Sequence, residues 1–155
     1  SLNSQGEIDQ MILEEVTGDM YRYGVLTRRE ETGEGMYKFY TYVYDVGGVP
    51  YTIPNSSTGF RASVGPIQLT GDPSAPERMY SLTSAGEGTI SGSEFLTDNQ
   101  RFAIWDQAAV YERRDGQYYL STLARAQEGD FTLTAWYDKP EAQGGRIRVI
   151  VAQEN

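Results

Sequence analysis

The chain of 155 residues contains no cysteine and no histidine. Without cysteine, the protein has no disulfide bonds, no thiol catalysis and no sulfur-ligated metal. Without histidine, it lacks the usual general base near neutral pH, the usual serine triad and most zinc sites. The sequence therefore predicts neither a cofactor nor a metal site.

Positive charge is scarce as well. Thirteen Lys and Arg residues face 22 Asp and Glu residues, for a formal net charge of −9, and Lys38 and Lys139 are the two lysines. Binding to a phosphate backbone needs clustered cations, whereas these arginines are scattered. No run of about 20 apolar residues is present, which a membrane-spanning helix would need. We therefore expect neither a nucleic-acid partner nor a membrane span.

Sequence signatures of catalysis are also missing. The chain has no G-x-S-x-G elbow, no P-loop, no dinucleotide-binding glycine pattern and no EF-hand loop. Gly33-Glu34-Gly35 and Gly86-Glu87-Gly88 are lone fragments that turns explain. The protein is therefore more simply interpreted as a non-enzyme.

Tyrosine, threonine and glycine are abundant, with 12 tyrosines and 17 glycines. Tyrosine suits half-buried strands and contact surfaces alike. Such a composition without cysteine is typical of many secreted, surface and virion proteins, although cytosolic proteins share it. We expect an extracytoplasmic location.

Short strand patterns separated by turn signals predict an all-β fold, an antiparallel β-sandwich or barrel of about nine to eleven short strands. Residues 1–155 show no repeat and no low-complexity linker, which indicates one domain. The expected strands are residues 20–28, 36–46, 49–53, 60–64, 67–70, 79–83 and 146–151. Residues 84–93 are expected to be a hairpin tip or a mobile loop, and residues 138–145 a loop.

Two features refine this outline. Ser4-Gln5-Gly6-Glu7 has the spacing of a capping box, and apolar residues follow on one helical stripe, which predicts a short N-terminal helix within residues 1–18. The alternative is an extended arm over residues 10–16 that pairs with a neighbouring subunit. Pro50 cannot donate a ladder hydrogen bond, so the strand after the Gly47-Gly48 turn is predicted to lie at a sheet edge.

The most informative stretch is residues 101–138, which we interpret as three consecutive antiparallel strands. Asp115-Gly116 is a type I′ hairpin signal because both central residues of that turn need a positive φ. The register then pairs Tyr111 with Leu120 and Asp106 with Arg125. A second turn at residues 127–130 would place Leu120 opposite Tyr137.

Because side chains alternate between the faces of a strand, this register sorts the three strands into an inner and an outer face. The predicted inner face, toward the core, holds Trp105, Ala109, Tyr111, Leu120, Ala124, Ala126, Phe131, Leu133, Ala135 and Tyr137. The predicted outer face holds Asp106, Val110, Glu112, Tyr119, Ser121, Arg125, Thr132, Thr134, Trp136 and Asp138.

The outer face supplies the candidate site residues. Glu112, Tyr119 and Asp138 would form one row, and carboxylates two strand spacings apart would be separated by about 9–10 Å. That approaches the separation in inverting glycoside hydrolases. Trp136 would be a stacking platform for a sugar ring. Asp106 and Arg125 are more simply a cross-strand ion pair.

Three functions are compatible with these patterns. The leading hypothesis is a non-enzymatic structural or interaction module of an extracellular, cell-surface or virion assembly that binds a protein partner or self-associates. The second is a module that binds a carbohydrate or another small ligand through Trp136, Tyr119, Glu112 and Asp138. The third is a glycan-active hydrolase that uses Glu112 and Asp138 as paired carboxylates.

Overall fold

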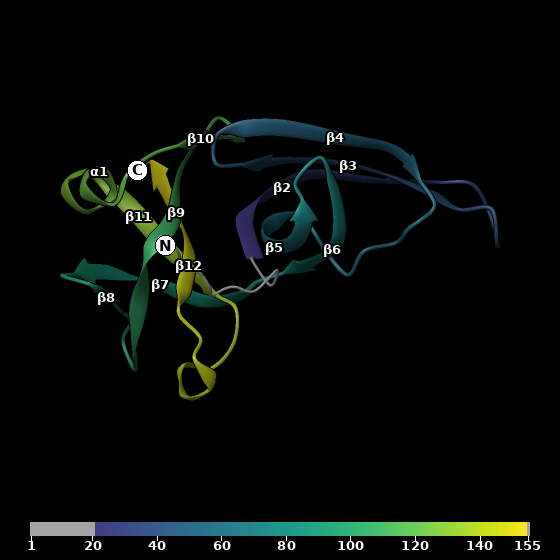
Figure 1. Cartoon of the computed structure of the whole chain (residues 1–155). Helices are drawn as coiled ribbons and strands as arrows, with labels where there is room; N and C mark the ends of the chain where they lie inside the picture. The colour runs from purple at the N-terminus through teal and green to yellow at the C-terminus, as the bar shows by residue number, and fades with distance from the viewer. Residues whose placement is uncertain (1–20, 155) are drawn as a thin grey trace, which may run out of the picture.

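The computed structural model describes residues 21–154 and confirms the predicted all-β class (Figure 1). Within these residues the chain forms strands β2 to β12, one short α-helix and one 3-10 turn, arranged in two curled or closed sheets. The predicted helix within residues 1–18, and its alternative as an extended arm, lie outside the described residues.

The first sheet is antiparallel, with the order β4-β3-β2-β5-β6. Gly47 and Gly48 form the turn between β3 and β4 with φ of 63° and 88°, as the sequence predicted. Pro50 lies on β4, which is an edge strand, so that prediction is confirmed too. The bounds are β2 Tyr21–Thr32, β3 Phe39–Val46, β4 Val49–Ser56, β5 Gly65–Asp72 and β6 Ala75–Ser81.

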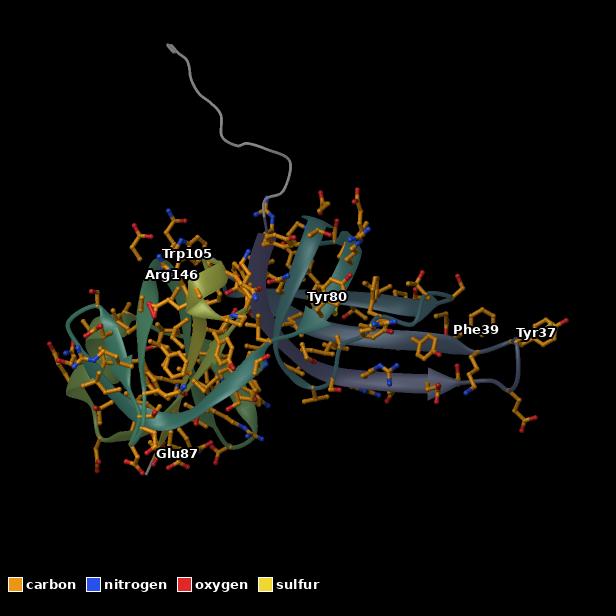
Figure 2. All side chains as sticks on the ribbon, turned by 90° about the horizontal axis from the view of Figure 1, so that it is seen from below. Tyr37, Phe39, Tyr80, Glu87, Trp105 and Arg146 are labelled. Atoms are coloured by element: carbon orange, nitrogen blue, oxygen red, sulfur yellow. The ribbon has the colours of Figure 1, made fainter. Side chains whose placement is uncertain are left out.

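Strands β2, β3 and β4 project from the rest of the molecule as an arm that ends in the loop between β2 and β3 (Figure 2). We call residues 33–39 the arm tip. A core of its own supports this sheet, because the alternate tyrosines of β3 all point to one side. That core consists of Leu26, Tyr42, Tyr44, Ala62, Ile67, Leu69 and Met79.

The second sheet closes on itself. Its order is β10-β9-β12-β11-β7-β8, and β8 also pairs with β9. Strands β9, β12, β11, β7 and β8 therefore form a closed barrel, and β10 pairs with β9 outside it. The bounds are β7 Thr83–Ser91, β8 Glu94–Leu96, β9 Arg101–Arg114, β10 Gln117–Leu120, β11 Phe131–Tyr137 and β12 Ile147–Glu154.

Chain order and pairing in the barrel follow one pattern. Strands β9 and β12 are parallel, and helix α1, Leu123–Glu128, lies between β9 and β11 in sequence. If β7, β8, β9, β11 and β12 are numbered one to five in chain order, their spatial order around the barrel is 1-2-3-5-4, and strand four pairs with strand one to close it. Helix α1 connects strands three and four in sequence. This is the Greek-key topology of the OB-fold, a barrel that hosts many unrelated functions.

The predicted three-strand meander is correct in its first hairpin and wrong beyond it. Asp115 and Gly116 have φ of 52° and 78°, and Tyr111 pairs with Leu120 as expected. Strand β11, however, pairs with β12 and β7 instead of β10. Closing the barrel takes β11 away from the hairpin, so Leu120 does not face Tyr137.

Helix α1 replaces the expected strand over residues 123–126. The Thr122 side chain accepts a hydrogen bond from the backbone N–H of Arg125, which satisfies one of the free amides of a helix start. Every residue of the following Leu-Ala-Arg-Ala-Gln-Glu stretch favours a helix. Ala126 turns into the barrel, and Arg125 does not meet Asp106.

Strand β7 replaces the expected loop at residues 84–93. Its glycines have a packing role, because a Cβ at Gly88 would lie 2.1 Å from the carbonyl oxygen of Leu96 and 2.9 Å from the ring of Phe95. Gly86 has a φ of 90° beside a register shift in the pairing with β11. Glycine therefore allows a sharply curved barrel strand here rather than a mobile loop.

Both faces of β9 are buried over residues 110–112, and both faces of β12 are buried over residues 149–152. One face packs inside the barrel, in a core of Ile90, Phe95, Ile104, Val110, Ala126, Leu133, Ala135, Ile147, Ile150 and Ala152. The other face packs against the first sheet, in an interface cluster of Tyr23, Val25, Leu82, Tyr111, Val149 and Val151, with Trp105, Ala109, Tyr118 and Trp136 at its margin.

The predicted inner face therefore splits between these two environments. Tyr111 lies in the interface, whereas Leu133 and Ala135 lie inside the barrel. Val110 and Glu112, which were expected to face outward, are buried, and Leu120 is 51% exposed. The two-sided burial has a simple cause: these strands separate two apolar compartments.

Candidate interaction sites

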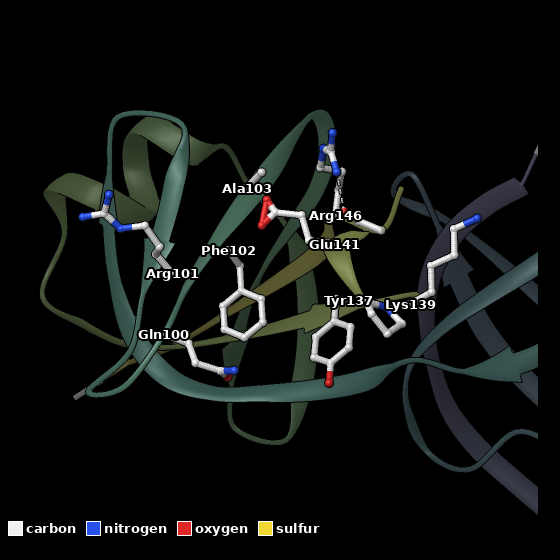
Figure 3. Close-up of a pocket in the computed structure, with 10 residues that line it drawn as sticks. Gln100, Arg101, Phe102, Ala103, Tyr137, Lys139, Glu141 and Arg146 are labelled. Atoms are coloured by element: carbon white, nitrogen blue, oxygen red, sulfur yellow. Dashed lines mark hydrogen bonds between the residues drawn. The ribbon is translucent and has the colours of Figure 1, made fainter. Parts of the chain in front are cut away.

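The barrel has two different ends. Helix α1 covers one end, and the loop between β11 and β12 lies at the other, where β9 begins (Figure 1). That second end contains a pocket of about 250 Å³, which we call the barrel mouth. Its lining comes from the start of β9 and from the β11–β12 loop: Gln100, Arg101, Phe102, Ala103, Tyr137, Lys139, Pro140, Glu141, Gly145 and Arg146 (Figure 3).

Aromatic rings and cations share the barrel mouth. Phe102 and Tyr137 stack with ring centroids 5.5 Å apart and planes 20° apart, and both pack on the barrel core. Lys139 is exposed, and one Nη of Arg146 donates to the carbonyl of Gly145 over 2.7 Å. The rings can contact an apolar group, while the cations at the rim can meet a carboxylate.

Asp138, one of the predicted site residues, shapes this loop. Its Oδ1 accepts hydrogen bonds from the backbone N–H groups of Lys139, over 3.0 Å, and Arg146, over 3.1 Å. Its Oδ2 lies 3.1 Å from Nε of Arg148. The side chain of Asp138 is 7% exposed, so it acts from beneath the loop and does not face a ligand.

Arg148 extends this network into the interface between the sheets. Its guanidinium lies 5.4 Å from the ring centroid of Tyr23 and 4.8 Å from that of Trp105, and these rings meet edge to face at 5.4 Å. Burial raises the pKa of Tyr23 to about 12, and the charge of Arg148 partly opposes that rise. Arg148 thus connects Asp138 under the barrel mouth to Tyr23 of the first sheet.

Glu112, another predicted site residue, lies at the opposite end of the barrel, under α1. Its carboxylate accepts hydrogen bonds from Arg125 and, over 2.6 Å, from the hydroxyl of Ser121, and Nε of Arg114 lies 3.9 Å away. Hydrogen bonds from Arg125 and then Ser121 hold the pKa of Glu112 below its usual range. The side chain is 5% exposed, which suits an anchor for the helix.

The predicted row of Glu112, Tyr119 and Asp138 is broken. Glu112 on β9 does pair with Tyr119 on β10. On its other side Glu112 pairs with Ala152 of β12, whereas Tyr137, the last residue of β11 before Asp138, pairs with Ile147 of β12. Five residues of β12 separate those levels, which is about 16 Å at 3.3 Å per residue. The two carboxylates therefore do not flank a common bond, and their placement gives no support to a paired-carboxylate hydrolase.

The remaining predicted site residues lie on separate surfaces. Tyr119 is exposed on β10, with the guanidinium of Arg114 4.3 Å from its ring centroid, and Asp106 is exposed on β9. Trp136 lines a shallow pocket of about 230 Å³ on the outer barrel wall. Its partners there are Glu87, Arg113, Tyr118, Thr132, Thr134, Val151 and Gln153.

The arm tip exposes large apolar side chains. Met36 is 89% exposed, Tyr37 71% and Phe39 41%. Arg28 pairs with Glu30, and Lys38 lies 3.6 Å from Glu31, so these charges on the adjoining strand ends are matched. Within residues 21–154, the Glu34 carboxylate has no such partner. Sequence reasoning overlooked this surface, although the run Met36-Tyr37 beside two glycines marks it.

Residues 21–154 contain no cluster of three or more acidic side chains that could hold a metal ion. They also contain no helix that is long and apolar enough to span a membrane. No protein-family model matches the sequence, and comparisons with curated proteins and with solved structures yielded no significant match.

Proposed function

We propose that this protein is a non-enzymatic interaction module of an extracellular, cell-surface or virion assembly, and that it contacts a protein partner through the arm tip. The observation that carries the proposal is the exposure of Met36, Tyr37 and Phe39 together at the end of a projecting arm (Figure 2). Clustered large apolar side chains usually mark contact surfaces, because exposing them to water is unfavourable.

The construction of the arm supports this proposal. The hydroxyl of Tyr111 in the barrel donates to Oδ1 of Asp45 over 2.9 Å and accepts from the backbone N–H of Gly47 over 3.2 Å. These bonds fix the base of the arm to β9. A tip held on a fixed arm loses little conformational freedom when it binds, which favours association.

Photo-cross-linking tests this function. Benzoylphenylalanine at Tyr37, in the protein within its native source, is expected to form adducts with one defined protein. The matched control carries the same group at Tyr21, which is 46% exposed but distant from the tip along β2. Identical adducts from both positions, or no protein adduct at position 37, would refute a contact through the tip.

A carbohydrate is a second candidate ligand, and the outer pocket of Trp136 favours it. There an indole ring lies beside hydrogen-bonding side chains of Glu87, Thr134 and Gln153, the chemistry by which proteins hold a sugar ring. A glycan array with wild type, Trp136→Ala and Glu87→Gln would test it. Binding that both variants retain would remove this candidate.

A further inference from the structure

We propose that the partner of the arm tip is a second copy of this chain, whose barrel mouth receives Met36 and Tyr37. The inference rests on the proposed function and names the partner of the same tip. It makes the contact heterologous, since the tip of one copy meets the mouth of the next.

The sizes of the two surfaces correspond. The barrel mouth measures about 250 Å³, below the range of about 300–1,000 Å³ that sites for drug-sized ligands occupy. One or two protruding side chains suit such a volume better than a large ligand does. Met36 and Tyr37 are the most exposed large apolar residues of the described chain, with 89% and 71% exposure.

Their chemistry corresponds as well. The stacked rings of Phe102 and Tyr137 present apolar surface in the mouth. A thioether such as that of Met36 makes favourable contacts with aromatic rings, and a third ring can pack edge to face on a stacked pair. Insertion would remove the apolar tip and the apolar part of the mouth from water together.

Charge fixes the direction of the contact. The mouth has three cations and the Glu141 carboxylate, in a chain whose net charge is −9. Arg101 lies 3.7 Å from Glu94, so the complementary charge comes from Lys139 and Arg146. Beside Met36 at the tip lies Glu34, whose carboxylate is exposed and unmatched by a cation within residues 21–154. Complementary charges of this kind steer encounter and select the register of a complex.

The arm points away from its own barrel, so the tip cannot fill the mouth of the same copy (Figure 2). A tip-to-mouth contact leaves one free tip and one free mouth on every dimer. Heterologous contacts of this kind extend into rings or open chains. A contact made by so few side chains is weak and transient in isolation, and repetition along an assembly strengthens it.

The test is sedimentation velocity over a concentration series that extends into the millimolar range. The tip variant is Met36→Ser with Tyr37→Ser, and the mouth variant is Lys139→Glu with Arg146→Glu. Arg78→Glu, at an exposed position on β6, controls for the reversal of a surface charge, with a change in net charge of −2 against −4 in the mouth variant. All substituted side chains lie at the surface or the pocket rim, and far-ultraviolet circular dichroism verifies that each variant folds.

Wild type and Arg78→Glu are expected to sediment faster as concentration rises, whereas each tip or mouth variant alone associates at least tenfold more weakly. A 1:1 mixture of the tip and mouth variants should recover a dimer and nothing larger, because the mixture contains one working mouth and one working tip per pair.

Three results would overturn the inference: a wild type that stays monomeric throughout, a mouth variant that associates like wild type, or a mixture that does not recover. The second result indicates tip-to-tip contact. In each case the cross-linking at Tyr37 still decides separately whether the tip binds another protein, so the two proposals can fail independently.

Discussion

At the scale of single residues, the buried charges of the barrel are structural. Glu112 holds α1 through Arg125 and Ser121, and Asp138 holds the mouth loop and Arg148. The alternation of side chains along the strands predicts that both carboxylates lie on one outer face. That alternation cannot show that a helix covers one end of the barrel, so the burial of Glu112 was not predictable from it. A polar residue at a strand end can face water or brace a neighbouring element.

Glu112→Gln is expected to lower the free energy of unfolding by about 1–3 kcal/mol at pH 7, because a buried charge-assisted network loses its anion. Because the pKa of Glu112 is lowered in the folded state, its contribution is complete above the ordinary value of 4.5 and declines as pH falls below it.

Urea unfolding between pH 3 and pH 7 measures this effect. The difference between wild type and Glu112→Gln should shrink below pH 4.5, while Glu128→Gln, at an exposed position on the same helix, should differ little from wild type at any pH. A difference that stays constant with pH would show that the charge of Glu112 contributes nothing.

Tyr23 provides the complementary test at high pH. Its pKa is raised to about 12, so the unfolded chain releases this proton near pH 10 before the folded protein does. Stability is therefore complete below pH 10 and declines between pH 10 and 12. The decline in the free energy of unfolding should be smaller in Tyr23→Phe, and an equal decline in both proteins would contradict the assignment.

At the scale of elements, turns and edges are predictable and closure is not. Asp115-Gly116, Gly47-Gly48 and Pro50 determine local geometry through φ or a missing N–H, and the structure has all three as expected. The pairing of β11 with β7 and β12 depends on contacts between distant segments. The alternation of apolar and polar residues along one strand does not show which other strands it pairs with.

Glycines and alanines explain the two misjudged elements. Three glycines within residues 84–93 resemble a loop, yet in β7 they allow close approach of neighbouring strands. Residues 123–126 fit a strand by alternation, yet their intrinsic preference is helical and Thr122 caps them. For residues 123–126, the intrinsic helix propensity was therefore a better guide than the alternation of side chains.

Gly88→Ala is expected to destabilise the protein by more than about 3 kcal/mol, because the new methyl group overlaps the Leu96 carbonyl and the backbone must shift. Ser91→Ala, at an exposed position on the same strand, should change stability by less than about 0.5 kcal/mol. Thermal unfolding of the two variants provides the comparison. Similar melting temperatures would show that β7 does not approach β8 so closely.

At the scale of the whole molecule, the interface cluster determines whether residues 21–154 unfold as one unit, as expected from the prediction of a single domain. Val25 of the first sheet and Val149 of the barrel are both fully buried there. Tyr111 and Arg148 add polar contacts across the same boundary. We therefore expect the two sheets to unfold together.

Val149→Ala should cost about 2–3 kcal/mol through the cavity that it leaves in the interface, and Val49→Ala, at a position 49% exposed, should cost little. Unfolding followed by tryptophan fluorescence reports on Trp105 and Trp136 of the barrel, whereas far-ultraviolet circular dichroism reports on all strands. Coincident transitions are expected, and separate transitions would instead show two independent domains.

The head-to-tail account can be tested most directly by paramagnetic relaxation between copies. The chain lacks cysteine, so Thr32→Cys, beside the arm tip, accepts a single nitroxide label. Mixed with 15N-labelled wild type, which has no thiol and so carries no nitroxide, the labelled variant should broaden the amide signals of residues 100–103 and 138–146 of the wild type and leave those of α1 sharp. Broadening at residues 33–39 of the second copy, or none at the barrel mouth, would contradict it.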